Sequence, residues 1–494
     1  MKIHKKLFFC KGLHLFSVLL FFSFQIISCG VGKKPDLPEF SEEKLPPAYG
    51  LIEHRDAIRF LSAEAWWEGF GSPELSRLIE EAFENNHNIL EAAARLDAAA
   101  ASLVSARSSL WPSLSFDAEA GHQHTKNSET GRRQSSERYH ALLAASYEVD
   151  VWGRVSALTA AEAARFRASA EDLDSLSMTI AATVAETWVL RVQTLGLISL
   201  VKRQSQEEDA LWSIQQGRFS NGLASAMDVM AQREVLLALQ ARLTELQATQ
   251  RLQAHTLALL TGKSAGTLML EEENLDKLSM PALPDPGLPI ELIEKRPDIR
   301  SAYQSLLAAG WEKEAAKAAR LPALTLSAKG GLTAASFSLL GEGWLLDAAA
   351  GLALPLFDAG KRKAEVAEKE ALLMEKATAY ERIVLTAVKE VLDALTLEER
   401  QKMLLEESAL RLEAAYATLE QALHRYRWGS DNFDTVLSAR SRIRDLEELL
   451  LAQKVGLAGA RISLYRALGG DWIKRNADQD GAGEPLVEDL AIVE

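Results

Sequence analysis

Cysteine is scarce in this chain: its 494 residues contain only Cys10 and Cys29. Positive charge is also in deficit, because 55 lysines and arginines face 69 aspartates and glutamates, for a net charge of −14. A strongly acidic chain is repelled by phosphate backbones, so we expect no nucleic-acid partner. The length is ample for a large core or for two repeats.

Catalytic and metal-binding motifs are missing as well. Gly262-Lys263-Ser264 ends like a phosphate loop, but Leu257 stands where that motif needs its earlier glycine. His122 and His124 lie in a polar stretch without a third ligand at suitable spacing, which favours solvated side chains over a metal site. No Ser/His/Asp set or pair of catalytic carboxylates has local support. We therefore expect no enzymatic activity, no metal and no nucleotide.

The first residues have the pattern of an export signal. Lysines open the chain, and a mostly apolar run from Leu13 to Ile27 follows. This run is shorter than the roughly 20 residues of a membrane-spanning helix and suits a secretory signal. It ends in Ser28-Cys29-Gly30, which resembles the lipoprotein signal whose cysteine is acylated. Cys29 would carry a covalent lipid as its only cofactor, Cys10 would be removed, and no internal disulfide could form. The alternative is a plain signal peptide with an incidental cysteine.

Two glycine-containing turns interrupt long helical patterns. Arg425 to Asp434 reads RYRWGSDNFD, and Arg218 to Ser225 reads RFSNGLAS. Gly429 lies 207 residues after Gly222, and a glycine between helices suits a residue with φ > 0 that reverses the chain. The recurrence indicates a duplicated unit whose two tips come together.

Each half of the chain reads as helix, β-hairpin, very long helix, tip and shorter helix. The first half should have one helix over 75–110, a polar loop over 122–138, and a helix over 155–219 that spans about 100 Å. Leucines spaced three and four apart in 236–246 predict a coiled-coil seam on the returning helix. The predicted segments are a signal peptide (1–28), a tether (29–65), a first repeat (66–262) with strands at about 113–121 and 139–151 and a tip at about 220–225, an inter-repeat segment (263–290), a second repeat (291–472) with strands at about 323–333 and 346–356 and a tip at about 427–433, and an acidic tail (473–494).

Four strands cannot close a barrel, and open strand edges cannot face lipid. The strands are nevertheless long enough, at about 9–12 residues, to cross an outer membrane when tilted. They must therefore pair with other chains or lie on a soluble body. Three copies would supply twelve strands and a tube of long helices. The predicted fold is mainly α with a small β part.

The order and spacing of several motifs resemble the TolC-like family of outer-membrane efflux proteins, in its OprM-like lipoprotein branch. These motifs are Trp66-Trp67-x-x-Phe70, 147–154 (YEVDVWGR), 296–299 (RPDI), 355–360 (PLFDxG) and 464–470 (LYRALGG). The resemblance covers nearly the whole mature chain.

The family implies a homotrimer with a 12-stranded barrel in the outer membrane of a Gram-negative bacterium. It also implies a continuous α-helical tunnel in the periplasm. The duct is passive, and it opens when a periplasmic adaptor and an inner-membrane pump dock on its tips. The lipoprotein branch favours a pump of the resistance-nodulation-division class, and an ATP-driven or type I partner stays open. The transported substrate cannot be read from the sequence.

The resemblance also assigns residues at the tips. An apolar and an acidic residue close the pore in related lipoproteins, and their positions fall on Asp434 and Ser438, which depart from that pattern. Because the two lie one helical turn apart, our hypothesis is that three copies of Asp434 form the closing ring and favour a trapped cation. The alternative is a solvated surface aspartate. The expected adaptor-docking residues are Gly222, Leu223, Ala224, Ser225, Gly429 and Ser430.

Two arginines near the tips have two interpretations. Arg218 and Arg425 could bond the last carbonyls of their helices, a structural role. They could instead hold a closed mouth by ion pairs.

Two other function classes were weighed against the duct. A structural or adhesin-like coiled-coil lipoprotein does not explain two strand pairs with long loops. An anchored enzyme lacks a catalytic motif. The duct is the function that the sequence favours.

Overall fold

The computed structural model describes residues 34–38, 44–46, 65–126, 131, 133–270, 279–281, 283–284, 287, 289–339 and 342–469. The predicted signal peptide, Cys29, most of the tether and the acidic tail lie outside the described residues. The chain divides into two compact units. Unit one takes the described parts of Met1–Phe40, Arg95–Ala170 and Ser301–Glu381, and unit two takes those of Ser41–Ala94, Glu171–Arg300 and Arg382–Glu494.

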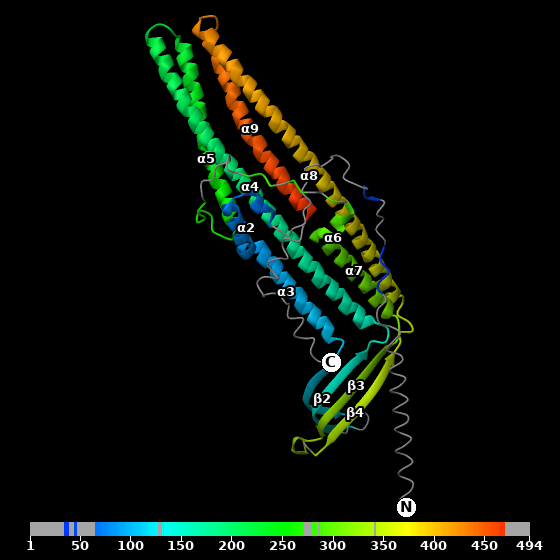
Figure 1. Cartoon of the computed structure of the whole chain (residues 1–494). Coiled ribbons are helices and arrows are strands. Elements are labelled where there is room, and N and C mark those ends of the chain that lie inside the picture. Colours follow the sequence, from blue (N-terminus) through cyan, green and yellow to red (C-terminus); the bar gives the residue numbers. More distant parts are fainter. Residues whose placement is uncertain are drawn as a thin grey trace, which may run out of the picture. The chain divides into compact units, whose positions relative to one another are not determined.

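The fold is mainly α with a small β part, as the sequence predicted (Figure 1). The first half of the chain contains η2 (Trp66–Phe70), α2 (Pro73–Asn85), α3 (His87–Ser108), β1 (Ser113–Lys126), β2 (Arg133–Val149), α4 (Arg154–Ser220) and α5 (Ala226–Leu260). The second half contains η4 (Pro289–Glu291), α6 (Leu292–Lys295), α7 (Pro297–Ala318), β3 (Ala323–Ala334), η5 (Phe337–Leu339), β4 (Trp344–Ala353), α8 (Lys361–Arg427) and α9 (Phe433–Leu468).

The two halves repeat each other closely. Helices α4 and α8 both have 67 residues, and α3 and α7 both have 22. Each long helix is preceded, within four residues, by an aspartate whose carboxylate accepts backbone N–H groups at the start of the helix. Asp150 accepts from Val155 and Ser156 at 3.0 and 2.7 Å, and Asp358 accepts from Gly360 and Arg362 at 3.0 and 3.2 Å. The same cap therefore starts both helices.

The single helix predicted over 75–110 is wrong, because the chain breaks at Asn86. The Asn86 side-chain oxygen Oδ1 accepts the N–H groups of Asn88 and Ile89 at 2.9 and 3.3 Å, so it caps α3. Its amide group donates to the backbone oxygen of Leu260 at 2.8 Å. At the start of α2, Ser72 accepts the Leu75 N–H at 3.2 Å, with Pro73 at the first helical position.

The four strands form one antiparallel sheet in the order β1-β2-β3-β4. The predicted polar loop over 122–138 is wrong, because most of it continues the first hairpin. His122 pairs with Glu137, and His124 pairs with Ser135. Both strands are polar here on both faces, so the sequence loses the alternation that reveals a strand, whereas backbone pairing continues. The free edges of the sheet are β1 and β4.

The register divides the sheet into an apolar and a polar face. Side chains that share a row across the strands lie on one face. Beyond Ala120 this face carries His122, His124 and Glu137, but Phe116, Leu143, Gly330 and Leu346 form one row of an apolar zone. Its further members are Leu114, Ala118, Ala120, Ala141, Ala145, Leu324, Leu326, Ala328, Leu332, Trp344, Ala348, Ala350 and Leu352. The opposite face carries Ser113, Ser115, Asp117, Glu119, His140, Ser146, Thr325, Ser327, Lys329 and Asp347.

Aromatic residues organise the core of unit two. Trp66 stacks on Tyr465, with ring centroids 5.4 Å apart, and Phe70 meets the edge of Trp188 at 6.4 Å. The Trp188 indole N–H donates to Glu74 at 3.1 Å. Helix α4 contains a stretch long and apolar enough to cross a membrane, but most of that stretch is buried inside the protein. Burial explains its composition.

The compact units do not follow the sequence repeats, since each unit takes segments from both. The physical reason is the length of α4 and α8. A 67-residue helix is much longer than a compact domain, so each of these helices contributes residues to both units.

Candidate functional site

Two matching turns join the long helices to their shorter partners within unit two (Figure 1). Between α4 and α5, Gly222 has φ +71°, and Leu223 N–H donates to the Arg218 carbonyl at 2.8 Å. Between α8 and α9, Gly429 also has φ +71°, and Ser430 N–H donates to the Arg425 carbonyl at 2.9 Å. A left-handed residue at this point requires glycine, which explains why the motif recurs.

The two turns differ in how the second helix begins. Ser225 forms a capping box with Asp228, through bonds of 2.8 and 3.1 Å. In the second turn, the Asp431 carboxylate accepts the Thr435 hydroxyl at 2.9 Å. That bond, with smaller help from the Asn432 N–H and Arg425, lowers the pKa of Asp431. Helix α5 therefore starts from a side-chain capping box, whereas the N-cap residue of α9, Asn432, makes no side-chain cap bond.

Arg218 and Arg425 occupy different positions in the two turns. The Arg218 guanidinium donates to the Leu223 carbonyl at 3.4 Å and lies 5.1 Å from the centre of the Tyr426 ring. It therefore braces its own turn and contacts the second hairpin through a cation–π interaction. Arg425 lies 3.6 Å from the Asp431 carboxylate in its own turn.

Apolar side chains are exposed on both tips. Leu223, Met227 and Trp428 are 67, 79 and 75% exposed. Single exposed apolar residues are ordinary on a protein surface, but large ones gathered at two adjacent turns mark an interaction surface. Asp434 and Ser438 lie on the first two turns of α9, and both are exposed.

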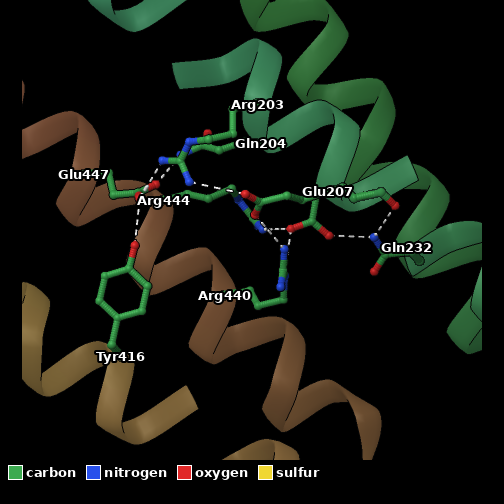
Figure 2. Close-up of polar contacts among 9 residues, drawn as sticks. Arg203, Gln204, Glu207, Gln232, Tyr416, Arg440, Arg444 and Glu447 are labelled. Carbon is green, nitrogen blue, oxygen red and sulfur yellow. Dashed lines mark hydrogen bonds and ion pairs between the residues drawn. The ribbon is translucent and has the colours of Figure 1, made fainter. Parts of the chain in front are cut away.

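Further from the turns, polar side chains of α4 and α5 meet those of α8 and α9 (Figure 2). Glu208 of α4 is one centre of this network, with its side chain 1% exposed. Its carboxylate accepts from Arg440 at 2.9 Å and Arg444 at 2.7 Å on α9. Gln232 of α5 donates to it at 2.6 Å. Without such donors, burying a charged carboxylate this deeply would strongly destabilise the folded protein.

Glu447 of α9 is the second centre. It accepts hydrogen bonds from Arg203, Gln204 and Tyr416, each at 2.8 Å. Burial opposes ionisation of this carboxyl, but the three donors outweigh burial and lower its pKa. The hydrogen bond to Glu447 also raises the pKa of Arg203. The two centres thus join α4 to α9 by charge-assisted bonds.

The network surrounds a small cavity of about 130 Å³, also lined by Leu419 and Ile443. This space is sufficient for water. Water can therefore replace a partner when a contact opens. The contacts between α4 and α9 at this cavity can therefore open without leaving their polar groups unhydrated.

The network was not identified from the sequence. Its signal is present as clustered acidic residues in 203–209 (RQSQEED) of α4 and as arginines in 439–445 (ARSRIRD) of α9, of which Arg440 and Arg444 share a helix face. What the sequence does not show is that these two faces meet, because the segments are more than 230 residues apart.

Comparisons with known proteins place this geometry in context. The family model of the outer membrane efflux protein matches residues 78–263 and 288–470. The pyoverdine export outer membrane protein OpmQ of Pseudomonas putida is 28% identical over 469 residues, covering 92% of this chain and 97% of OpmQ. The probable efflux pump outer membrane protein TtgC of the same species is 27% identical, covering 89% of this chain and 92% of TtgC. Among solved structures, the outer-membrane channel OprN aligns with a TM-score of 0.81 at 26% identity, covering 88% of this chain and 99% of OprN.

Proposed function

Because the chain belongs to the outer membrane efflux protein family, we propose that it is the passive, trimeric exit duct of a tripartite efflux pump. The sheet carries this proposal. Among the described residues its outer strands β1 and β4 have no further strand partner, and one face is apolar from Leu114 to Ala120 of β1 across to β4. Such a sheet is stable in a membrane only when its edges are closed by other copies. Three copies give twelve strands and six helices of the α4 and α8 type.

Trimer formation is tested on the mature protein extracted in detergent. We expect a mass of three chains and a hollow, threefold particle in electron microscopy. A monomer or a solid rod would replace the duct with the structural-lipoprotein alternative. Reconstitution of the same sample in planar bilayers should give discrete conducting steps.

The charged network supports a gate at the periplasmic end. Glu208 and Glu447 hold α9 against α4, and their contacts can be exchanged for water. We expect Arg440→Ala combined with Arg444→Ala to loosen α9 and to raise single-channel conductance. The matched control is Lys389→Ala, which removes an exposed ion pair within α8 alone. Equal conductance in both variants and the parent would refute the gate.

The proposed closing ring consists of three copies of Asp434, with Ser438 one turn further along α9. Its support is the exposed position of both side chains on the same face of α9. Asp434→Ala should increase the leak of closed channels and reduce their preference for cations. An unchanged leak with unchanged selectivity would assign Asp434 to the solvated surface instead.

Docking of a periplasmic adaptor is proposed for the two tips, around Gly222–Ser225 and Gly429–Ser430. The exposed Leu223 and Trp428 support it, since such side chains are typical anchors of protein interfaces. Leu223→Ser with Trp428→Ser should abolish dye efflux in the native host without changing conductance of the purified trimer. Met269→Ser is the control, because Met269 is 90% exposed and lies outside both tips.

The inner-membrane partner we propose is a pump of the resistance-nodulation-division class, supported by the lipoprotein-like signal and by the relatives described as efflux pump proteins. OpmQ and TtgC differ in the role that their names give them, so neither supplies the substrate of this chain. We infer no catalytic role and no cofactor beyond a lipid on Cys29.

A further inference from the structure

The four long helices that lead to the tips are covered unevenly within unit two. Helix α9 contacts the other three: it packs on α8 in an apolar cluster around Ile443, pairs with α4 through Glu208 and meets α5 through Arg242. Over its whole length, all of which the structure describes, α9 exposes no large apolar side chain. Helices α5 and α8 instead each expose a row of such side chains.

Helix α5 is apolar on two opposite faces. Leu239 and Leu246 are buried in a cluster with α4. Five further large side chains are between 52 and 79% exposed, namely Met227, Met230, Leu237, Leu252 and Leu259. At about 100° per residue, these five fall within a sector of about 80°, roughly opposite the buried pair. The described part of this chain covers only the first of the two faces.

Helix α8 has a second exposed row. Leu385, Met403 and Leu410 are 41, 56 and 67% exposed. They are separated by 18 and 7 residues, close to about five and about two whole turns, so they share one helix face. Ala415, which packs toward α9, lies on a different side of the helix. Large exposed apolar residues gathered in this way mark an interaction surface.

The two rows lie on the helices that adjoin the open edges of the sheet in chain order. Helix α8 follows β4. Helix α5 ends beside Asn86, whose side chain bonds Leu260 and caps α3, and α3 leads into β1. Closure of the proposed barrel brings β4 of one copy to β1 of the next, and therefore brings α8 of one copy toward α5 of the next. A contact between these rows presupposes the proposed trimer.

The length of the rows favours another long helix as the partner. From Met227 to Leu259 the row on α5 extends about 48 Å, and from Leu385 to Leu410 the row on α8 extends about 38 Å. A protein that docks on the tips alone would cover only the Met227 end of the first row. A helix of comparable length in the next copy can cover most of it.

The positions along the helices also agree. Gln232 of α5 bonds Glu208 of α4, so Leu237, five residues further along α5, lies near the level of Arg203 in the antiparallel α4. Leu410 occupies the same position in α8 that Arg203 occupies in α4. Leu237 of one copy and Leu410 of the next are thus expected at a similar level.

We propose that the exposed row of α5 packs on the exposed row of α8 in the next copy, and that this seam stays closed when the contact between α4 and α9 opens. The α4–α9 contact is charged and borders a cavity that water can enter. The two rows consist of leucine and methionine, so separating them would expose apolar surface to water. Opening then separates three bodies, each made of α8 and α9 of one copy with α4 and α5 of the next.

The partner is identified by cross-linking two kinds of copy. Full-length chains with Leu237→Cys are co-expressed with chains carrying Leu410→Cys, and the membranes are treated with a flexible bis-maleimide. Each copy should present one free thiol, because we expect Cys10 to be removed and Cys29 to be acylated. A two-chain product should appear that neither variant gives alone. Ile214→Cys in place of Leu237→Cys is the control and should give none, because Ile214 of α4 is 57% exposed but belongs to neither row.

Charge substitutions test the same contact without a reagent. Leu237→Glu with Leu410→Glu places like charges across the seam and should abolish the trimer in detergent. Leu237→Glu with Leu410→Lys should restore the trimer, because the charges then attract. Equal trimer yields from the two pairs would overturn the seam.

Conductance tests whether the seam stays closed. Trimers with both Leu237→Cys and Leu410→Cys should conduct equally in planar bilayers before and after cross-linking. Lower conductance after cross-linking would show that the seam moves during opening. Conducting trimers that give no Leu237–Leu410 product would overturn the seam and leave the rows to a partner protein. A protein that forms neither trimers nor pores would instead refute the duct itself, and this inference with it.

Discussion

Buried carboxylates decide how firmly α9 is held to α4. Glu208 and Glu447 each collect three donors, from helices that the chain order separates widely. Charge-assisted bonds are stronger than neutral ones, but breaking one leaves a buried charge behind. The network is therefore strong while every partner is present and fails as a unit when one is lost.

We predict that Glu447→Gln destabilises the protein at pH 7 by about 1.5–3 kcal/mol, the range for hydrogen bonds to charged groups. Folding lowers the pKa of Glu447 from its ordinary value of 4.5. Its contribution is thus fully present above pH 4.5 and is lost as pH falls through the folded value. Thermal unfolding of parent and variant between pH 7 and 3 should show the difference shrinking at the acidic end.

Glu448→Gln is the control for this experiment. Glu448 neighbours Glu447 but is 30% exposed and contacts Arg242 at 3.1 Å. A pair of this kind contributes at most about 1 kcal/mol. A pH-independent difference for Glu447→Gln, or an equal effect of Glu448→Gln, would contradict the role given to Glu447.

The two helical hairpins have the same plan but different cores near their turns. Between α8 and α9, Ala422, Phe433 and Val436 form an apolar cluster. Between α4 and α5, Gln215 and Gln232 are buried at 2 and 0% exposure. Buried apolar area stabilises a coil more than buried amides do. The duplicated unit has therefore diverged into a firmer and a weaker hairpin.

We predict that backbone amides in 212–232 exchange about tenfold faster than those in 420–436, which corresponds to about 1.4 kcal/mol. Within the described part of the chain, the Gln215 side-chain oxygen has no hydrogen-bond partner. Gln215→Leu should slow exchange in 212–232. Gln216→Leu is the control, because Gln216 is exposed and its replacement should leave the exchange rate unchanged. Hydrogen-exchange mass spectrometry measures both rates. Equal rates in the two hairpins would show that the buried amides do not lower the stability of the first hairpin.

The faces of the sheet supply a second prediction at this scale. Leu346 is the third residue of β4 and lies on the apolar face, where an arginine in contact with lipid should cost up to about 2–4 kcal/mol. Leu346→Arg should therefore reduce the yield of assembled, membrane-inserted protein. Ser327→Arg, on the polar face, should assemble normally. Equal yields from membrane fractionation would mean that the apolar face does not contact lipid.

Much of the element order was readable from the sequence, because glycine turns, caps and long apolar periods are local signals. The strand bounds at 122–138 were missed, since both faces become polar there and pairing continues without alternation. The break at Asn86 was missed for a related reason. The Asn86 side chain caps α3 locally, but its amide group also donates to the distant Leu260, and no local pattern reports a contact across that separation. The charged network was missed for both reasons: its residues are polar on exposed-looking helix segments, and they meet across a large separation in the sequence.

At the scale of the whole molecule, a single chain cannot close its four-stranded sheet into a barrel. The sheet has two open edges, and the proposed lipid on Cys29 adds a second attachment to the membrane. The described tether residues pack against α7. Pro35 and Leu37 lie so close to Gly310 of α7 that an added Cβ would approach to 2.9 and 2.7 Å. Lys313 donates to the Asp36 carbonyl at 3.3 Å.

The tether therefore limits where the lipid can lie. Lys34 is five residue steps after Cys29, which allows an extended reach of at most about 17 Å. A lipid on Cys29 would thus remain close to unit one, which also contains the sheet. We predict that Cys29→Ala abolishes incorporation of labelled palmitate, whereas Cys10→Ala leaves it unchanged, because we expect Cys10 to be removed with the signal peptide.

Barrel insertion should survive the loss of the lipid, because twelve paired strands bury far more apolar surface than one anchor, and a single acyl chain binds membranes only marginally. Cys29→Ala trimers should therefore still sediment with the outer membrane after a high-salt wash, at a reduced rate of assembly. Label retained in Cys29→Ala, or lost in Cys10→Ala, would show that the predicted cleavage site is wrong. Complete release of Cys29→Ala into the periplasm would mean that the lipid, and not the barrel, holds the protein in the membrane.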